Sequence, residues 1–115
     1  MEISAVLITY NEADRLEAAL KSVEGIADEI VIVDSHSTDE TARIAQKYTD
    51  RFFPRDWTNY SDQKNYANSQ ASFPWILSLD ADERLSSALR DEILDLKREE
   101  PSASAFSMPR QAFYL

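Results

Sequence analysis

The chain has 115 residues, a formal net charge of −9, 43% apolar residues and no cysteine. These totals describe one small domain, or part of a larger one, with enough apolar residues for a core, and they exclude a disulfide framework and a thiolate metal site. The strong negative charge also argues against binding to a nucleic-acid backbone, which needs basic patches.

Glycine is almost absent, and Gly25 is the only one. A glycine-rich dinucleotide loop and a P-loop both need several glycines at fixed spacing, so neither can be formed here. An anionic ligand is also unwelcome on so acidic a chain unless a metal ion or local cations offset the charge. Residues 3–10 are apolar but too short and too acidic in their flanks for a secretion signal, and no run approaches the ~18 residues of a membrane span, so we expect a cytoplasmic protein.

The first half of the chain alternates apolar runs with helical stripes. Residues 3–8 and 30–33 are near-continuous apolar runs, as is typical of parallel strands that are covered on both faces. Asn11 is a favourable N-cap for a helix that ends near Gly25. Residues 37–40 have capping-box spacing, which predicts a second helix directly after them.

The second half continues this alternation. The expected elements are a strand over residues 51–53, a loop over 55–60, a helix over 61–70, a strand over 75–79, a helix over 85–96 that Pro101 ends, and an antiparallel edge strand over 103–108. The order of strands and helices predicts an open, mostly parallel α/β sheet with helices on both faces. A last apolar run over 112–115 indicates a truncated chain with an apolar end suited to self-association.

Three carboxylates follow the predicted strand over residues 75–79, namely Asp80, Asp82 and Glu83. Ligands of open parallel sheets bind at the carboxyl ends of the strands, and an Asp-x-Asp there can hold a hard cation that also contacts phosphate oxygens. This pattern predicts a site for Mg²⁺ or Mn²⁺ and a diphosphate. The alternative is that Asp82 and Glu83 are surface residues at the favourable end of the helix that follows.

The ends of three predicted strands, at residues 9–12, 34–35 and 80–83, point to one edge of such a sheet and form a single crevice. There Tyr10 can offer a flat face to a base, and Asp34 or Ser35 can bond a base or ribose edge. The alternatives are that Tyr10 belongs to the core and that Asp34 caps the turn after it.

Four other side chains are placed less firmly by the sequence. Lys64 can supply the positive charge that a diphosphate needs, or it can be a solvated surface lysine. Trp57 and Tyr60 either flank the predicted ligand site or cover the apolar edge near Phe52 and Phe53. His36 has no evident partner and is interpreted as a loop residue.

Four segments occur in an order that resembles the donor-binding half of family 2 glycosyltransferases: residues 8–12 (ITYNE), 33–41 (VDSHSTDET), 63–67 (QKNYA) and 79–83 (LDADE). The resemblance spans about residues 3–95 and is closest to bacterial enzymes of lipopolysaccharide-core sugar transfer. It implies a GT-A fold in which residues 1–115 are the nucleotide-sugar-binding N-terminal part, with the acceptor-binding half absent.

The resemblance also implies residue roles on the nucleoside side. Thr9, Tyr10 and Glu12 would line the pocket for the base and ribose of the donor. Asp34 would contact the nucleoside, although many relatives have two acidic residues where this chain has Asp34 and Ser35.

On the diphosphate side, Lys64 stands where relatives commonly have an arginine near the nucleotide. Asp80 and Asp82 match the Asp-x-Asp motif, with Asp80 near the nucleotide and Asp82 as the expected direct ligand of Mg²⁺ or Mn²⁺. Such a cation would stabilise the charge that gathers on the departing nucleotide diphosphate.

The predicted activity is therefore inverting sugar transfer from a nucleotide-diphosphate sugar, with a UDP-sugar favoured, to a glycan or glycolipid of the cell envelope such as the lipopolysaccharide core. A general base is also needed, and the resemblance places it beyond Leu115, so we expect the chain to be inactive alone. With a lipid acceptor, the protein would lie at the inner face of the membrane.

Three alternatives remain open at this level. A receiver-type phosphoacceptor domain has a similar sheet and acidic cluster, but it needs an acidic pair after the first strand and a lysine after the last. A nucleotidyltransferase needs a glycine-rich basic loop after residue 9. A non-catalytic nucleotide-sugar-binding fragment is compatible with truncation.

Overall fold

The computed structural model describes residues 1–98 and 111–114. Its elements in chain order are β1 (Ile3–Thr9), α1 (Ala13–Ser22), β2 (Glu29–Asp34), α2 (Thr41–Gln46), β3 (Phe52–Pro54), α3 (Tyr60–Ser69), β4 (Trp75–Asp80), α4 (Ser87–Arg98) and β5 (Gln111–Tyr114). The strands form a five-stranded sheet in the order β3-β2-β1-β4-β5, and every neighbouring pair is parallel. The predicted α/β class and parallel sheet are confirmed.

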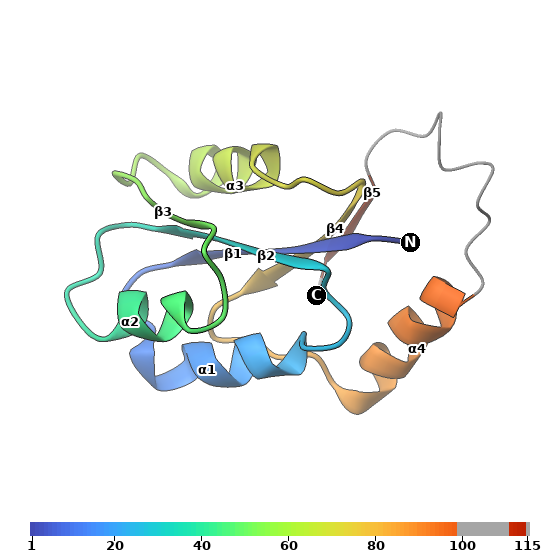
Figure 1. The fold of residues 1–115 in the computed structure, drawn as a ribbon. Coiled ribbons are helices and arrows are strands. Elements are labelled where there is room, and N and C mark those ends of the chain that lie inside the picture. Colours follow the sequence, from blue (N-terminus) through green and yellow to red (C-terminus); the bar gives the residue numbers. More distant parts are fainter. Residues whose placement is uncertain (99–110, 115) are drawn as a thin grey trace.

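Helices cover both faces of this sheet. Figure 1 shows α3 on one face and α1, α2 and α4 on the other. The central strands therefore have no solvent-facing side, which is why β1 and β2 are continuous apolar runs in the sequence rather than alternating ones.

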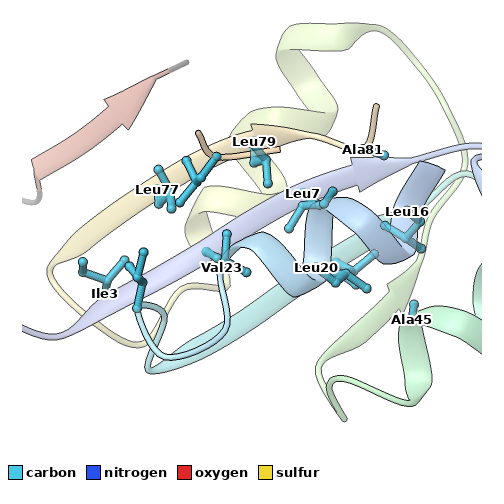
Figure 2. Packing of buried hydrophobic residues seen from close by; sticks show 14 of the residues in the cluster. Ile3, Leu7, Leu16, Leu20, Val23, Ala45, Leu77, Leu79 and Ala81 are labelled. Carbon is cyan, nitrogen blue, oxygen red and sulfur yellow. The ribbon is translucent and has the colours of Figure 1, made fainter. Parts of the chain in front are cut away.

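The larger core lies between the sheet and α1. Alternate residues of β1, including Ile3 and Leu7, belong to one cluster with Leu16 and Leu20 of α1 and Leu77 of β4 (Figure 2). The smaller core lies under α3, where Val6, Val31 and Val33 of the sheet pack with Ala67 and Ala71. Burial on both faces fixes the register of the strands, because a slip by one residue would exchange the two faces.

The register brings the ends of the three central strands to the same level. Thr9 of β1 is opposite Asp34 of β2, and Ile8 of β1 is opposite Asp80 of β4. The loops after these strands consequently leave the sheet side by side at one edge, as the sequence predicted.

The start of α1 differs from the prediction. Asn11 is not the N-cap of α1: that position is Glu12, which makes no capping bond through its side chain. Instead, Asp39 from the loop before α2 accepts hydrogen bonds from the backbone N–H groups of Ala13 (3.3 Å) and Thr41 (2.9 Å). One carboxylate thus contacts the starts of two helices, and α2 begins at Thr41, directly after residues 37–40 as the sequence predicted.

The C-terminal predictions have mixed outcomes. Residues 111–114 form β5, which pairs with β4 in the parallel sense. The predicted edge strand over 103–108 lies outside the described residues. Within the described part of the chain, no helix is long and apolar enough to cross a membrane.

Candidate functional site

Two hollows open at the edge where β1, β2 and β4 end. The first encloses about 330 Å³, and its lining includes Tyr10, Glu12, Asp80 and Asp82. The second encloses about 450 Å³ and is lined by Tyr10, Ser35 and Trp57. Because Trp57 and Tyr10 line both hollows, the two spaces form one site with an aromatic end and an acidic end.

The aromatic end consists of two large side chains that stay in contact with solvent. Tyr10 is 57% exposed and Trp57 is 53% exposed, so neither belongs to the core. The sequence left Trp57 undecided because its loop has no periodicity. In the structure Trp57 lines a hollow together with Tyr10, which gives the site two flat apolar walls.

Asp34 is buried behind this end, with 2% of its surface exposed. Its carboxylate accepts hydrogen bonds from the Thr9 hydroxyl (2.6 Å), the Ser37 hydroxyl (2.6 Å) and the Ser37 backbone N–H (2.8 Å). The alternative that Asp34 caps the turn after β2 therefore describes what its side chain does here. A nucleoside contact of Asp34 stays a prediction.

The loops after β1 and β2 are joined to each other near the site. The Asn11 side-chain oxygen accepts a hydrogen bond from the Thr38 backbone N–H at 2.8 Å, and the Ser37 hydroxyl oxygen accepts one from the Asn11 backbone N–H at 2.8 Å. Asn11 and His36 have φ angles of 50° and 57°, in the left-handed region that side chains other than glycine seldom adopt. This mutual bracing holds Tyr10, which directly precedes Asn11.

At the acidic end, Lys64 and Tyr60 of α3 both contact Asp80. The Lys64 ammonium donates to the Ser78 hydroxyl at 2.5 Å and lies 3.7 Å from Asp80 Oδ1, and the Tyr60 hydroxyl donates to the same carboxylate at 3.3 Å. The Lys64 side chain is only 12% exposed, so it is not a freely solvated lysine. One carboxylate oxygen of Asp80 is thus shared by two donors.

These contacts shift two pKa values. Burial lowers the pKa of Lys64 below its ordinary 10.5, and the nearby Asp80 carboxylate only partly offsets that effect. Burial raises the pKa of Tyr60 above 10.0, and the negative charge of Asp80 adds to the shift. The Lys64 ammonium group is thus held at low exposure beside the site.

Asp82 differs from Asp80 in having no partner within the described part of the chain. Its side chain is exposed and lines the same hollow as Tyr10 and Glu12. The turn that carries it is closed by the Glu83 backbone N–H, which donates to the Asp80 carbonyl at 2.9 Å, and by the Asp80 N–H, which donates to Glu83 Oε1 at 3.1 Å. This turn aims a carboxylate with all its acceptor capacity free into the hollow.

The described residues contain no group of three or more His, Cys, Asp or Glu side chains arranged to hold a metal ion. The donor set still fits Mg²⁺ or Mn²⁺, because these ions take oxygen ligands and are commonly bound through one or two carboxylates together with phosphate oxygens of a substrate. Asp82, with Asp80 as a second carboxylate, supplies such a partial set.

The structure thus collects most of the residues that the sequence singled out. Thr9, Tyr10, Glu12, Asp80 and Asp82 line one hollow. Lys64 contacts it through Asp80, and Asp34 lies behind Thr9. Residues 63–67 were part of a recognised segment, but the sequence assigned no role to Gln63, which is fully buried and bonds Ser35 at the aromatic end.

A family model described as "Glycosyl transferase family 2" matches residues 4–111. An uncharacterized glycosyltransferase of Rickettsia bellii is 48% identical over 92 residues, which are 80% of this chain and 31% of the relative. The lipopolysaccharide core biosynthesis glycosyltransferase LpsC of Rhizobium meliloti is 45% identical over 101 residues, which are 84% of this chain and 37% of that protein. The chain thus spans about a third of the length of the curated relatives it matches.

Among solved structures, residues 1–349 of S. aureus TarS in complex with UDP superpose with a TM-score of 0.64 and 25% sequence identity, covering 85% of this chain and 32% of that one. A second structure of the same TarS segment gives a TM-score of 0.63 and 26% identity, with 85% of this chain and 33% of that one covered. Sequence and structure comparisons therefore point to the same class of protein.

Proposed function

This chain belongs to glycosyl transferase family 2, and from that premise we propose that it is the donor-binding part of an inverting, metal-dependent glycosyltransferase. Its substrate is a nucleotide-diphosphate sugar, with a UDP-sugar favoured because the structurally similar TarS was crystallised with UDP. The fold is of the GT-A type, as in the TarS structures. The receiver-type and nucleotidyltransferase alternatives are set aside by the family match.

The observation that carries the proposal is the chemical difference between the two ends of the site. Tyr10 and Trp57 give its aromatic end, which suits a base, and Asp80 and Asp82 give its acidic end. A nucleoside diphosphate has the same sequence of chemistries, from a flat base to a charged diphosphate that a cation must bridge to carboxylates.

For the metal ion, we propose Asp82 as the direct protein ligand, with Asp80 beside it. Asp82 is free of protein partners in the described part of the chain, whereas Asp80 already contacts Lys64 and Tyr60. Mg²⁺ or Mn²⁺ in this place would act as a Lewis acid toward the charge that develops on the departing nucleotide diphosphate.

The protein residues then have separable tasks. Lys64, whose ammonium lies 3.7 Å from Asp80, holds this carboxylate in place and adds a positive charge near the diphosphate. Thr9 and Glu12 line the space between base and diphosphate. The general base that takes the proton from the acceptor hydroxyl belongs to a part beyond Leu115, so we propose that residues 1–115 bind the donor without turning it over.

The proposed acceptor is a glycan or glycolipid of the cell envelope, such as the lipopolysaccharide core. LpsC, which is 45% identical over 101 residues, is named for that pathway. Sugar transfer to a lipid-borne acceptor from a nucleotide sugar would place the protein at the inner face of the membrane. Its acceptor contacts would be made by the second half of the enzyme.

Isothermal titration calorimetry tests the donor proposal directly. The chain is titrated with UDP and with UMP, each with and without Mn²⁺. We expect UDP to bind more tightly in the presence of Mn²⁺, and UMP to show a smaller gain because it offers only one phosphate to the cation. Equal UDP affinity with and without Mn²⁺ would contradict the metal-dependent site.

A further inference from the structure

Ser35 lines the hollow at the aromatic end of the site together with Tyr10 and Trp57. A hydroxyl group can donate or accept a hydrogen bond, so the role left for a ligand depends on which hydrogen bonds the protein already makes with that hydroxyl. The partners of Ser35 settle this question through a buried network behind the hollow.

The network is centred on Gln63, which is fully buried on α3. Its side-chain oxygen accepts a hydrogen bond from Arg55 Nη1 at 3.0 Å. Its side-chain nitrogen donates to the Arg55 backbone carbonyl at 3.4 Å and to Ser35 Oγ at 3.1 Å. Thus a single amide group joins the loop after β2 to the loop after β3.

The orientation of the Gln63 amide follows from partners that cannot change roles. A guanidinium only donates and a backbone carbonyl only accepts, so the amide oxygen must face the Arg55 guanidinium and the amide nitrogen must face the Arg55 carbonyl. The amide nitrogen is therefore the atom that faces Ser35. It donates, and Ser35 Oγ accepts.

Arg55 is itself held firmly in place. Its guanidinium donates to Asp62 Oδ2 at 2.7 Å and lies 4.5 Å from the centre of the Tyr66 ring. Its backbone N–H donates to the Asp34 carbonyl at 2.8 Å, directly before Ser35 in the chain. The polarity of the amide is consequently fixed from both sides.

Since Gln63 donates to Ser35 Oγ, the hydroxyl hydrogen of Ser35 must point to another acceptor. Among residues 1–98, no side chain or backbone carbonyl accepts it. The nearby Asp34 carboxylate, an obvious acceptor, already receives hydrogen bonds from Thr9 and Ser37. The Ser35 O–H is left as a donor beside the space between two aromatic walls.

We propose that Ser35 is a specificity-determining residue that donates a hydrogen bond to an acceptor atom of the donor's base, a carbonyl oxygen in the case of uracil, and that Gln63 is the positioning residue that fixes this polarity. The base lies between Tyr10 and Trp57, where ring stacking supplies affinity and Ser35 supplies discrimination. A carboxylate at position 35 would instead favour a base edge that presents an N–H group. This inference rests on the proposed function.

The test compares UDP with ribose 5-diphosphate, which lacks the base, for binding to the chain in the presence of Mn²⁺. We expect Ser35→Ala to weaken UDP binding about fivefold to tenfold, the size of one hydrogen bond. It should leave the affinity for ribose 5-diphosphate unchanged. The matched control Ser87→Ala, an exposed serine on α4, should change neither affinity.

A second variant, Gln63→Glu, changes the polarity with little change in shape. A glutamate carboxylate accepts hydrogen bonds from both Arg55 and Ser35, so the Ser35 hydrogen turns away from the base. UDP binding should weaken to a similar extent as in Ser35→Ala, with ribose 5-diphosphate binding retained. Retention of the base-free ligand shows that the variant is folded.

Two thio analogues identify the acceptor atom, because sulfur accepts hydrogen bonds more weakly than oxygen. Either 2-thio-UDP or 4-thio-UDP should bind wild type more weakly than UDP does, and the difference should vanish in Ser35→Ala. Equal binding of UDP by wild type and Ser35→Ala would overturn the inference while leaving the proposed function intact. If neither UDP nor ribose 5-diphosphate binds with Mn²⁺, the proposed function fails and the inference fails with it.

Discussion

The ends of β2 and β4 each carry an aspartate at the same edge of the sheet, and the two aspartates have opposite environments. Asp34 at the end of β2 is 2% exposed and accepts hydrogen bonds from Thr9 and from Ser37. The Asp80 side chain at the end of β4 is 46% exposed, and within the described residues its carboxylate is approached only by the Lys64 ammonium and the Tyr60 hydroxyl.

The two carboxylates therefore differ in how much of their hydrogen-bond acceptor capacity the protein itself uses. At β2, the acceptor capacity of the carboxylate is used to hold two loops together. At β4, Asp80 contacts a lysine and a tyrosine, and Asp82, which lines the hollow, has no partner within the described residues. A place at the end of a strand therefore does not by itself make an aspartate a ligand contact. The number of hydrogen-bond donors that the protein supplies to the carboxylate also decides how much of it is available to a ligand.

The largest expected effect is on stability at the β2 end. Asp34→Ala leaves the Thr9 hydroxyl and both Ser37 donors without their acceptor, and we expect the free energy of unfolding to fall by about 3 kcal/mol. Urea denaturation followed by circular dichroism measures this change. Asp82→Ala at the β4 end should alter the free energy of unfolding by no more than about 0.5 kcal/mol. Equal losses of stability in the two variants would contradict the difference between the two strand ends.

The next effect concerns ligand affinity at the aromatic end. Trp57→Ala removes one wall of the base site, and we expect UDP affinity to fall about tenfold, within the range of one stacking interaction. Trp57→Phe keeps an aromatic face and should retain most of the affinity. Because Trp57 is 53% exposed, both variants should unfold at nearly the same urea concentration as wild type. An unchanged UDP affinity in Trp57→Ala would show that Trp57 does not stack on the base.

A smaller effect is the pH dependence that Lys64 contributes. Its pKa in the folded chain is below 10.5, so the folded chain releases this proton at lower pH than the unfolded chain does. Where only the unfolded chain still binds the proton, stability rises with pH. We therefore expect the unfolding free energy of wild type, relative to Lys64→Met, to increase as pH rises from the folded-state value toward 10.5.

Denaturation of wild type and Lys64→Met over a series of alkaline buffers measures this difference and cancels groups common to both proteins. A difference that falls with pH over the same range would mean that Asp80 outweighs burial. The charge of Lys64 would then be stabilising, in disagreement with its position beside Ser78 at 12% exposure.

The smallest effect is expected for Tyr60→Phe. The hydroxyl donates to Asp80 over a long 3.3 Å contact at an exposed position, so its loss should change the unfolding free energy by less than about 0.5 kcal/mol. The same denaturation assay measures it. A loss as large as that of Asp34→Ala would show that the β4 end is also a structural network.

The fold could be predicted from sequence because its signals are local. Residues 3–8, 30–33 and 75–79 are continuous apolar runs, and helical stripes between them leave only a parallel sheet with covered faces. The same signals placed Tyr10, Asp34 and Asp82 at strand ends. The register then brought these ends to one edge.

The features that the sequence did not reveal depend on contacts between residues that are far apart in the chain. Asp39 serves the start of α1 across 26 positions, so no capping pattern near Asn11 could identify it. The occupation of Asp34 by Thr9 likewise joins residues 25 positions apart. Trp57 lies in a loop without periodicity, and only the packing of that loop beside Tyr10 places it in the site.

The most direct test of the central claim, that the carboxylate end of β4 and not that of β2 binds the cation and diphosphate, is the UDP affinity of Asp82→Ala with and without Mn²⁺. Asp91→Ala, an exposed aspartate of α4, is the matched control. We expect Mn²⁺ to tighten UDP binding at least about tenfold in wild type and in Asp91→Ala, and to have little effect in Asp82→Ala. An Asp82→Ala variant in which Mn²⁺ tightens UDP binding as much as in wild type would contradict the account.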